Sequence, residues 1–209
     1  MRNIYRGVGN RIAINILDLG NNVSIEKAFS ILKENGINEI EICMLSIAKE
    51  LVTKAQWKLR SGQWEAPLFF DCSSLTKWLY GQKGIWIPRR PIQQFEHCKK
   101  SGESISLEHA KQGDLMFTTS QFKNGVRIGD NDGWHVFFVS DNKKAICATN
   151  SEFGIGVVEV PFTEIFKTRK LRKIYSVTER RIPLTTFLIP PNREIETSDD
   201  IKHIILQSL

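Results

Sequence analysis

After a short strand-like lead-in, the spacing of apolar residues changes close to residue 114, and that change limits the fold more than any other feature. Before it, apolar residues recur at three- and four-residue steps, as in helices that bury one face. After it, short apolar runs divided by turn residues have the spacing of strands. Helices followed by an antiparallel sheet is the α+β pattern. We therefore expect an α+β fold, with N-terminal helices packed on a C-terminal antiparallel β-sheet.

Two helices are expected in the first sixty residues. Ser24 can cap a helix through residues 25–35. A second helix should cover about residues 39–58, because its apolar residues fall on one stripe. The members of that stripe are Ile40, Cys43, Met44, Ile47, Ala48 and Leu51. Cys43 is therefore expected to be a core residue.

The remaining elements follow the same two spacings. A third helix should begin at Asp71 or Cys72, and a short fourth helix should lie within residues 87–100. The expected strands cover residues 12–16, 114–119, 134–140, 144–149, 156–160 and 169–178. Residues 118–133 are expected to form a polar loop that controls access to a groove. The last residues, 201–209, resemble a short helix.

The length of 209 residues suits one domain with extensions. We expect an N-terminal extension at residues 1–37, a main domain at 38–178 and a C-terminal tail at 179–209. No apolar run approaches the ~18 residues that a bilayer span needs, and no secretory signal is evident at the start. We therefore expect a monomer without a membrane span. It would stay in the cytoplasm as encoded or leave by a non-standard route.

The net charge of +6 gives the surface some attraction for anionic polymers. The basic residues are scattered and no nucleic-acid-binding motif accompanies them, so we expect no specific nucleic-acid partner. An anionic cell-wall polymer would be attracted equally well. The four cysteines lie far apart without a C-x-x-C pair, which argues against a disulfide framework and a zinc site. We expect no metal and no cofactor.

Cys72 stands where an apolar run turns into the expected third helix. A helix N-terminus supplies positive potential and backbone N–H groups, which favour a reactive thiolate and could stabilise an oxyanion. Asp71 can cap this helix. Among four histidines, His135 in an expected strand is the best candidate for a base. An inert core cysteine is the competing interpretation, since free cysteines are commonly buried.

The stretch "FFDCSSLTKWLYGQKGIWIPRRPIQQ", residues 69–94, resembles the signature of the NlpC/p60 family of papain-like cysteine peptidases. The similarity rests on Asp71, Cys72, Ser73, Leu75, Gly84, Ile85, Pro88, Arg89 and a glutamine at 93 or 94. Downstream, "QGDLMF", "HVFFV" and "GVVEV" are similar to later strands of that family. The resemblance covers roughly residues 39–162.

The resemblance implies a papain-like fold and cleavage of peptide bonds in bacterial cell-wall peptides, commonly beside D-glutamate and diaminopimelate. Cys72 would be the nucleophile and His135 its base, acting through an acyl-enzyme. The expected function is a thiol-dependent hydrolase of a peptide or amide bond, with a peptidoglycan stem peptide as its substrate. Two alternatives are a non-catalytic or weakly active wall-peptide-binding module, and an amidase or acyltransferase of the same mechanism on another substrate.

The chain departs from the family pattern upstream of Cys72. Where the family has a tyrosine that borders the oxyanion site, this chain offers Trp57 or Trp64. An indole N–H can donate a hydrogen bond, although its reach differs. Both tryptophans are equally compatible with a core position. Together with Asp71 and Ser73, they are the candidates for the oxyanion site or the substrate groove.

The residue that orients His135 is a second departure. An ungapped match places Cys147 at that position, but a thiol is a weak acceptor. A two-residue turn at 141–142 would put Asn150 on the sheet face of His135, whereas a three-residue loop would put Cys147 and Thr149 there. Asn150 is favoured by its chemistry and Cys147 by its position, and the residues alone do not decide between them.

Overall fold

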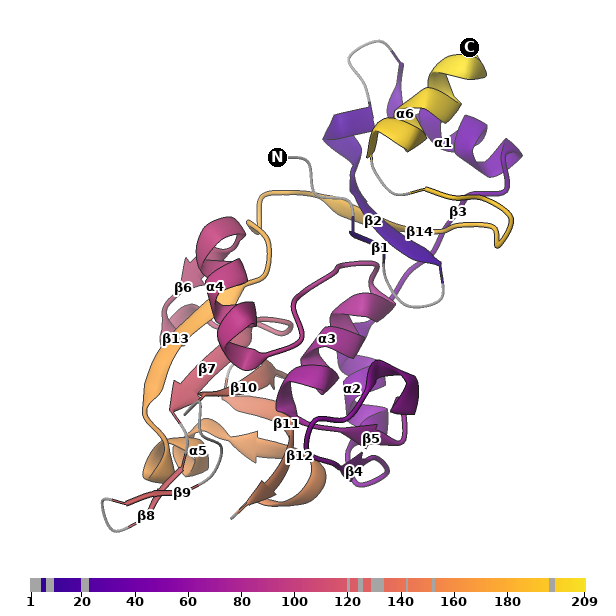
Figure 1. The fold of residues 1–209 in the computed structure, drawn as a ribbon. Coiled ribbons are helices and arrows are strands. Elements are labelled where there is room, and N and C mark those ends of the chain that lie inside the picture. Colours follow the sequence, from indigo (N-terminus) through magenta and orange to yellow (C-terminus); the bar gives the residue numbers. More distant parts are fainter. Residues whose placement is uncertain are drawn as a thin grey trace. The chain divides into compact units, whose positions relative to one another are not determined.

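A computed structural model describes residues 5–6, 10–19, 23–119, 121–123, 126–128, 134–141, 143–151, 153–195 and 198–209. The chain divides into two compact units. Unit 1 consists of Met1–Cys43, Tyr80–Trp86 and Arg181–Leu209, and unit 2 consists of Met44–Leu79 and Ile87–Arg180. Each unit has its own sheet (Figure 1).

Unit 1 combines a four-stranded antiparallel sheet with two helices. The strand order is β1 (Tyr5–Arg6), β2 (Arg11–Asn15), β14 (Leu184–Leu188) and β3 (Asn38–Glu39). The other elements are the 3-10 helix η1 (Ile16–Leu19) and the helices α1 (Ile25–Glu34) and α6 (Ser198–Gln207). The predicted cap of α1 is confirmed, because the Lys27 N–H donates to the Ser24 hydroxyl at 3.2 Å.

The turn around Gly84 belongs to unit 1, although it is flanked in sequence by parts of unit 2. Gly84 has a φ of 77°, and a Cβ atom there would lie 2.6 Å from the backbone nitrogen of Ala13. Its carbonyl accepts the Ala13 N–H at 3.1 Å. Glycine is required here both by the backbone conformation and by this close approach to β2.

Unit 2 is built on a six-stranded antiparallel sheet in the order β12–β11–β10–β7–β13–β6. The strands are β6 (Glu103–Ile105), β7 (Leu115–Thr119), β10 (Trp134–Val139), β11 (Lys144–Ser151), β12 (Gly154–Pro161) and β13 (Leu171–Ser176). The helices are α2 (Met44–Leu51), α3 (Cys72–Gln82), α4 (Pro91–Ser101) and α5 (Phe162–Thr168), of which α3 ends in unit 1. Short elements are η2 (Gln63–Glu65), η3 (Leu107–His109) and the pairs β4 (Gln56–Trp57) with β5 (Phe69–Phe70) and β8 (Gln121–Lys123) with β9 (Val126–Ile128). The predicted α+β class is confirmed, with helices ahead of an antiparallel sheet (Figure 1).

The two faces of this sheet bury different partners. On one face the ring of Phe95, from α4, packs against Phe117 at 5.5 Å and Trp134 at 4.7 Å between centroids. The other face carries an apolar cluster that includes Phe137 and, from α5, Ile165. Because strand residues alternate between faces, His135 lies on the second face, beside Phe137.

The second predicted helix is too long at both ends. Its expected first residues are extended instead, because the Ile40 N–H donates to the Thr186 carbonyl at 2.9 Å and continues the pairing of β3. Cys43 therefore lies ahead of α2 and is exposed, so the prediction that Cys43 is a core residue is wrong. After α2, Thr53 has a φ of 66°, which is incompatible with a continuing helix.

The polar stretch at residues 118–133 is not a single loop. Thr118 and Thr119 belong to β7, and residues 121–123 and 126–128 pair as β8 and β9, so the prediction is wrong for these residues. Residues 120, 124–125 and 129–133 of the stretch lie outside the described residues. None of the helices in the described part of the chain is long and apolar enough to cross a bilayer.

Candidate active site around Cys72

Cys72 is the first residue of α3, and it is 8% exposed. The predicted N-cap is confirmed: Oδ1 of Asp71 accepts the Ser74 N–H at 2.8 Å, and its carbonyl accepts the Leu75 N–H at 3.0 Å. Cys72 therefore sits on the first turn, where the aligned peptide dipoles give a positive potential. This is the environment in which proteins keep reactive thiolates.

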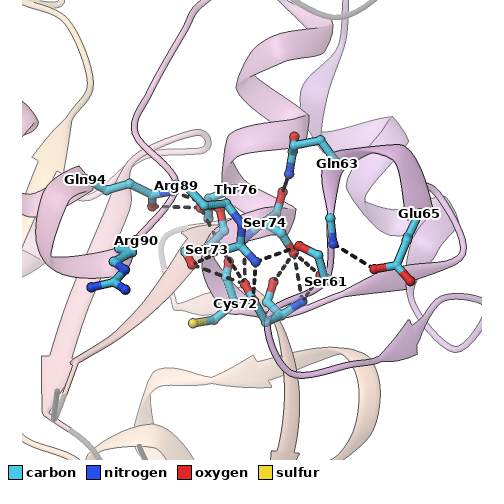
Figure 2. Close-up of polar contacts among 12 residues, drawn as sticks. Ser61, Gln63, Glu65, Cys72, Ser73, Ser74, Thr76, Arg89, Arg90 and Gln94 are labelled. Carbon is cyan, nitrogen blue, oxygen red and sulfur yellow. Dashed lines mark hydrogen bonds and ion pairs between the residues drawn. The ribbon is translucent and has the colours of Figure 1, made fainter. Parts of the chain in front are cut away.

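Arg89 holds the capping residue in place. Its Nη1 donates to Oδ1 of Asp71 at 3.0 Å and to the Ser73 hydroxyl at 2.8 Å. Its Nη2 donates to Oδ2 of Asp71 and to the Ser61 carbonyl at 2.7 Å. The Asp71 charge next to Cys72 is thus balanced by its ion pair with Arg89, whose side chain lies beside Ser73 in Figure 2. In the same view, the Cys72 sulfur points away from this cluster.

A buried glutamine fixes the other side of the first turn. Gln94 is fully buried, and its Nε2 donates to the carbonyls of Ser73 at 2.9 Å and Pro88 at 3.0 Å. Its Oε1 accepts the Thr76 hydroxyl at 2.8 Å. Gln93 instead accepts the Arg90 N–H at the start of α4. Of the two glutamines that fit the signature, Gln94 is therefore the one that contacts the Cys72 helix.

Two serines link the helix start to the preceding loop. The hydroxyls of Ser61 and Ser74 lie 2.7 Å apart, and Ser61 also accepts the Asp71 N–H at 2.9 Å (Figure 2). Ser74 stands where the family pattern has glycine, and its buried hydroxyl has a defined partner. Sequence reasoning did not find Ser61, because nothing local distinguishes it from other loop serines.

His135 lies on β10 and is 9% exposed, opposite Thr118 of β7. Its ring packs edge-on against Phe137, with centroids 4.6 Å apart. Burial lowers the pKa of His135 well below its usual value of 6.5, and the positive charge of Arg169 lowers this pKa further. The imidazole is therefore neutral at pH 7. Among the described residues, its Nε2 is buried and has no hydrogen-bond partner.

Arg169 is the residue near this histidine that sequence reasoning missed. It follows α5, is 7% exposed, and its Nη1 donates to the Thr119 carbonyl at 3.3 Å. Its guanidinium lies 5.6 Å from the centre of the Phe153 ring. No motif surrounds Arg169 in the sequence, and only the fold brings it towards β10.

The β10–β11 hairpin has the longer of the two loops considered from the sequence. Val139 pairs with Ala145, and the Ser140 N–H donates to the Lys144 carbonyl at 3.0 Å. Positions 147 and 149 therefore share the sheet face of His135. Asn150 lies on the opposite face and is exposed, so the preference for Asn150 as the orienting residue is wrong on geometry.

The side chains that do share the His135 face are weakly polar. Cys147 is fully buried in the apolar cluster around Phe137. Thr149 is 3% exposed, and its hydroxyl donates to that of Ser151 at 2.8 Å. Neither side chain supplies the carboxylate or amide oxygen that usually orients a catalytic imidazole.

The two candidate tryptophans occupy different environments. Trp57 is partly buried and pairs in register with Phe70, two residues ahead of Cys72. Trp64 lies in η2 and is 88% exposed. Asp71 and Ser73, the other two groove candidates, lie at the helix start beside Cys72, and both contact Arg89.

The remaining titratable groups do not form a second reactive centre in the described residues. Burial raises the pKa of the Cys98 thiol to about 12, so it is protonated at neutral pH. Within the same part of the chain, no cluster of three or more His, Cys, Asp or Glu side chains could hold a metal ion.

The fold is similar to several solved structures. NlpC2 from Trichomonas vaginalis matches with a TM-score of 0.48 and 18% identity, over 63% of this chain and 43% of that protein. An NLP/P60 family protein of Staphylococcus aureus, described as similar to a lipoprotein, matches with a TM-score of 0.45 and 22% identity, over 68% of this chain and 43% of that protein. The peptidoglycan hydrolase RipB of Mycobacterium tuberculosis matches with a TM-score of 0.40 and 19% identity, over 78% of this chain and 81% of that protein. This chain thus spans less than half of the first two proteins.

The family is established by the sequence itself. Residues 57–163, just over half of the chain, match the family model described as the NlpC/P60 family. The match includes the start of α3, the buried glutamine of α4 and the strands β7, β10, β11 and β12. This chain belongs to the NlpC/P60 family.

Proposed function

We propose that this protein is a thiol-dependent hydrolase that cleaves a peptide or amide bond in bacterial cell-wall peptides. Members of its family are generally hydrolases. The observation that carries the proposal is the position of Cys72 on the first turn of a capped helix, beside an Asp71 whose charge is balanced by Arg89. A core cysteine would not need a helix start fixed by so many polar contacts.

Cys72 is the nucleophile in the proposed reaction. Its sulfur forms a bond to the carbonyl carbon of the substrate, and the carbonyl electron pair moves to oxygen, where N–H groups of the first turn stabilise it. His135 accepts the thiol proton and gives it to the leaving amine. Water then attacks the acyl-enzyme, with His135 taking its proton, and the acid product and the free thiol are released.

The neutral state of His135 determines how the proton moves. A thiolate–imidazolium pair needs an imidazole that holds a proton more tightly than the thiol does. Burial and Arg169 oppose the charged imidazolium, so a resting thiolate–imidazolium pair is disfavoured, and the positive potential that favours a thiolate at Cys72 comes from the first turn of α3. Proton transfer then accompanies the attack on the substrate rather than preceding it.

A second candidate function is binding of wall peptides without turnover. It is favoured by the His135 surroundings: within the described residues, Nε2 has no hydrogen-bond partner, and Cys147 takes the place of the family's polar orienting residue. An unoriented imidazole samples unproductive positions, which slows general-base catalysis. Peptide binding would be kept while the rate falls.

The deciding experiment incubates the purified chain with muropeptides and measures product masses. We expect two fragments whose masses sum to that of the substrate plus water. Cys72→Ala should abolish the products, whereas Cys43→Ala, at an exposed cysteine, should leave them unchanged. Thermal unfolding of each variant checks that it folds. Unchanged masses with measurable muropeptide binding would support the second candidate, and unchanged masses without binding would reject both.

A further inference from the structure

Trp64 has the most exposed large apolar side chain in the described part of the chain, at 88%. An indole of this size is usually at least partly buried, because its hydration is unfavourable. Leu59 and Leu68, on the same loop, are also exposed, at 48% and 66%. The loop between β4 and β5 therefore presents apolar side chains to solvent.

The Trp64 ring nevertheless packs on one side against the backbone of its own loop. A Cβ atom at Gly62 would lie 2.5 Å from two carbons of the ring, so the indole rests directly on the Gly62 backbone. The Glu65 carboxylate accepts the Gly62 N–H at 2.7 Å and forms an ion pair with Lys58. Only a glycine at position 62 leaves room for this packing.

The segment that carries Trp64 is attached to the helix that begins at Cys72. On one side, Gln63 Nε2 donates to the Ser74 carbonyl at 3.2 Å. On the other side of Gly62, Ser61 contacts both Ser74 and Arg89 (Figure 2). The loop on both sides of Gly62 is thus attached to the first turn of α3, which places Trp64 on a segment suited to a substrate that must reach Cys72.

The loop that carries the ring has a small net charge, because Lys58 and Arg60 are basic and Glu65 is acidic. Lys58 and Glu65 neutralise each other, and Lys58 also lies 5.7 Å from the centre of the Phe69 ring. The indole face carries partial negative charge and attracts polarised C–H bonds. A pyranose ring presents C–H bonds on its faces and hydroxyls at its edge, and it carries no net charge. A lipid surface would call for several basic side chains and a broader apolar face, whereas this loop adds only the exposed Arg60 to the Lys58–Glu65 pair.

We propose that Trp64 is a carbohydrate platform that stacks on a sugar ring of the wall glycan whose peptide is cleaved at Cys72. The choice of a wall glycan rests on the proposed function, whereas stacking on an N-acetylhexosamine ring does not. A rigid aromatic surface loses little conformational entropy on binding. The protein would therefore bind a glycan-linked peptide more tightly than the free peptide.

The test uses the full chain with Cys72→Ala, which keeps substrates intact, and isothermal titration with three probes. These are chitotetraose, a free stem peptide and a disaccharide–peptide. Adding Trp64→Ala should weaken binding of the disaccharide–peptide and chitotetraose by about tenfold, roughly the effect of one lost stacking contact. Binding of the free peptide should change by less than about twofold. Trp86→Ala, at another exposed tryptophan, is the matched control.

A second variant keeps the indole but moves it. Gly62→Ala would displace the Trp64 ring from the backbone on which it packs, and it should cause a similar loss of affinity for both sugar probes. The proposal is overturned if the sugar probes do not bind or if Trp64→Ala leaves their affinity unchanged. It is also overturned if Trp64→Ala weakens binding of the free peptide by as large a factor. Trp64-dependent binding to lipid vesicles in place of sugar would also overturn it. Because these titrations need no turnover, an inactive wild-type protein that still shows Trp64-dependent sugar binding would reject only the proposed hydrolase.

Discussion

The guanidinium of Arg89 contacts both carboxylate oxygens of Asp71, and this pair fixes the helix that begins at Cys72. Asp71 is almost buried, and Arg89 is the side chain that pairs with its carboxylate. The same guanidinium also contacts the hydroxyl of Ser73 and the carbonyl of Ser61. One arginine thus joins the cap, the first turn and the preceding loop, and its removal affects stability and the nucleophile together.

We expect Arg89→Ala to lower the free energy of unfolding by about 2–3 kcal/mol, because it leaves an almost buried carboxylate unpaired. Arg89→Lys should recover part of this loss, since a lysine keeps the charge but not the planar fork. Urea unfolding measures both. Arg90→Ala is the control, because Arg90 is exposed, and this substitution should cost less than about 0.5 kcal/mol. Equal losses for Arg89→Ala and Arg90→Ala would contradict the assigned role.

The hairpin register predicts which residue behind His135 affects turnover. Asn150→Ala should change kcat/KM by less than about twofold, because its side chain lies on the other sheet face. Thr149→Val, which removes a hydroxyl from the His135 face, should lower kcat/KM by about tenfold. Steady-state cleavage of a muropeptide gives both values. A large loss for Asn150→Ala alone would show that the register in solution is that of the shorter turn.

The fold was predictable where the pattern is local. Alternation of apolar residues predicted β7, β10, β11 and β12, and Ser24 and Asp71 marked the starts of α1 and α3. The second helix was overextended because Ile40 pairs with Thr186, and a partner some 146 positions away leaves no local signal.

The site, too, was predictable only where its residues are close together in the sequence. Cys72, Asp71 and Arg89 are close in sequence and belong to one signature, so the helix start could be anticipated. Arg169 acts on His135 only because α5 and β13 return to β7, which no spacing rule predicts. Whether Asn150 shares the sheet face of His135 depended on whether the hairpin loop has two or three residues. A change of one residue in loop length moves every side chain of the following strand to the opposite face.

The cysteines should differ in their reaction with iodoacetamide near pH 6. Cys72 should react fastest, because the first turn of α3 favours its thiolate. Cys43 is exposed but lies ahead of α2 and not on the first turn of a helix, so it should react more slowly than Cys72. Cys98 should stay unmodified in the folded protein, because burial raises its pKa to about 12. Mass spectrometry of peptides at several reaction times gives the three rates. If Cys72 reacts no faster than Cys43, the nucleophile assignment fails.

His135 should make the stability of the protein depend on pH below 6.5. Its pKa is lowered in the folded state, so between 6.5 and that lower value the unfolded chain binds a proton that the folded chain does not. Stability from this residue is therefore complete above pH 6.5 and is lost as the pH falls, by about 1.4 kcal/mol per pH unit. His97, whose pKa is lowered by burial and by Lys77, adds a contribution of the same sign.

The measurement is the free energy of unfolding in urea at several pH values from 7 to 5, for the wild type and His135→Gln. We expect the variant to show a shallower fall, and His97→Gln in the same background to flatten it further. Asp114, whose pKa is raised by burial, makes a pH-dependent contribution of the opposite sign. Because Asp114 is present in every variant, this contribution cancels when the unfolding free energies of two variants are compared. His203→Gln, at an exposed position, controls for the loss of a histidine as such. Parallel curves for wild type and His135→Gln would mean that His135 is protonated as readily when folded as when unfolded. The resting imidazole would then be able to form an ion pair with Cys72.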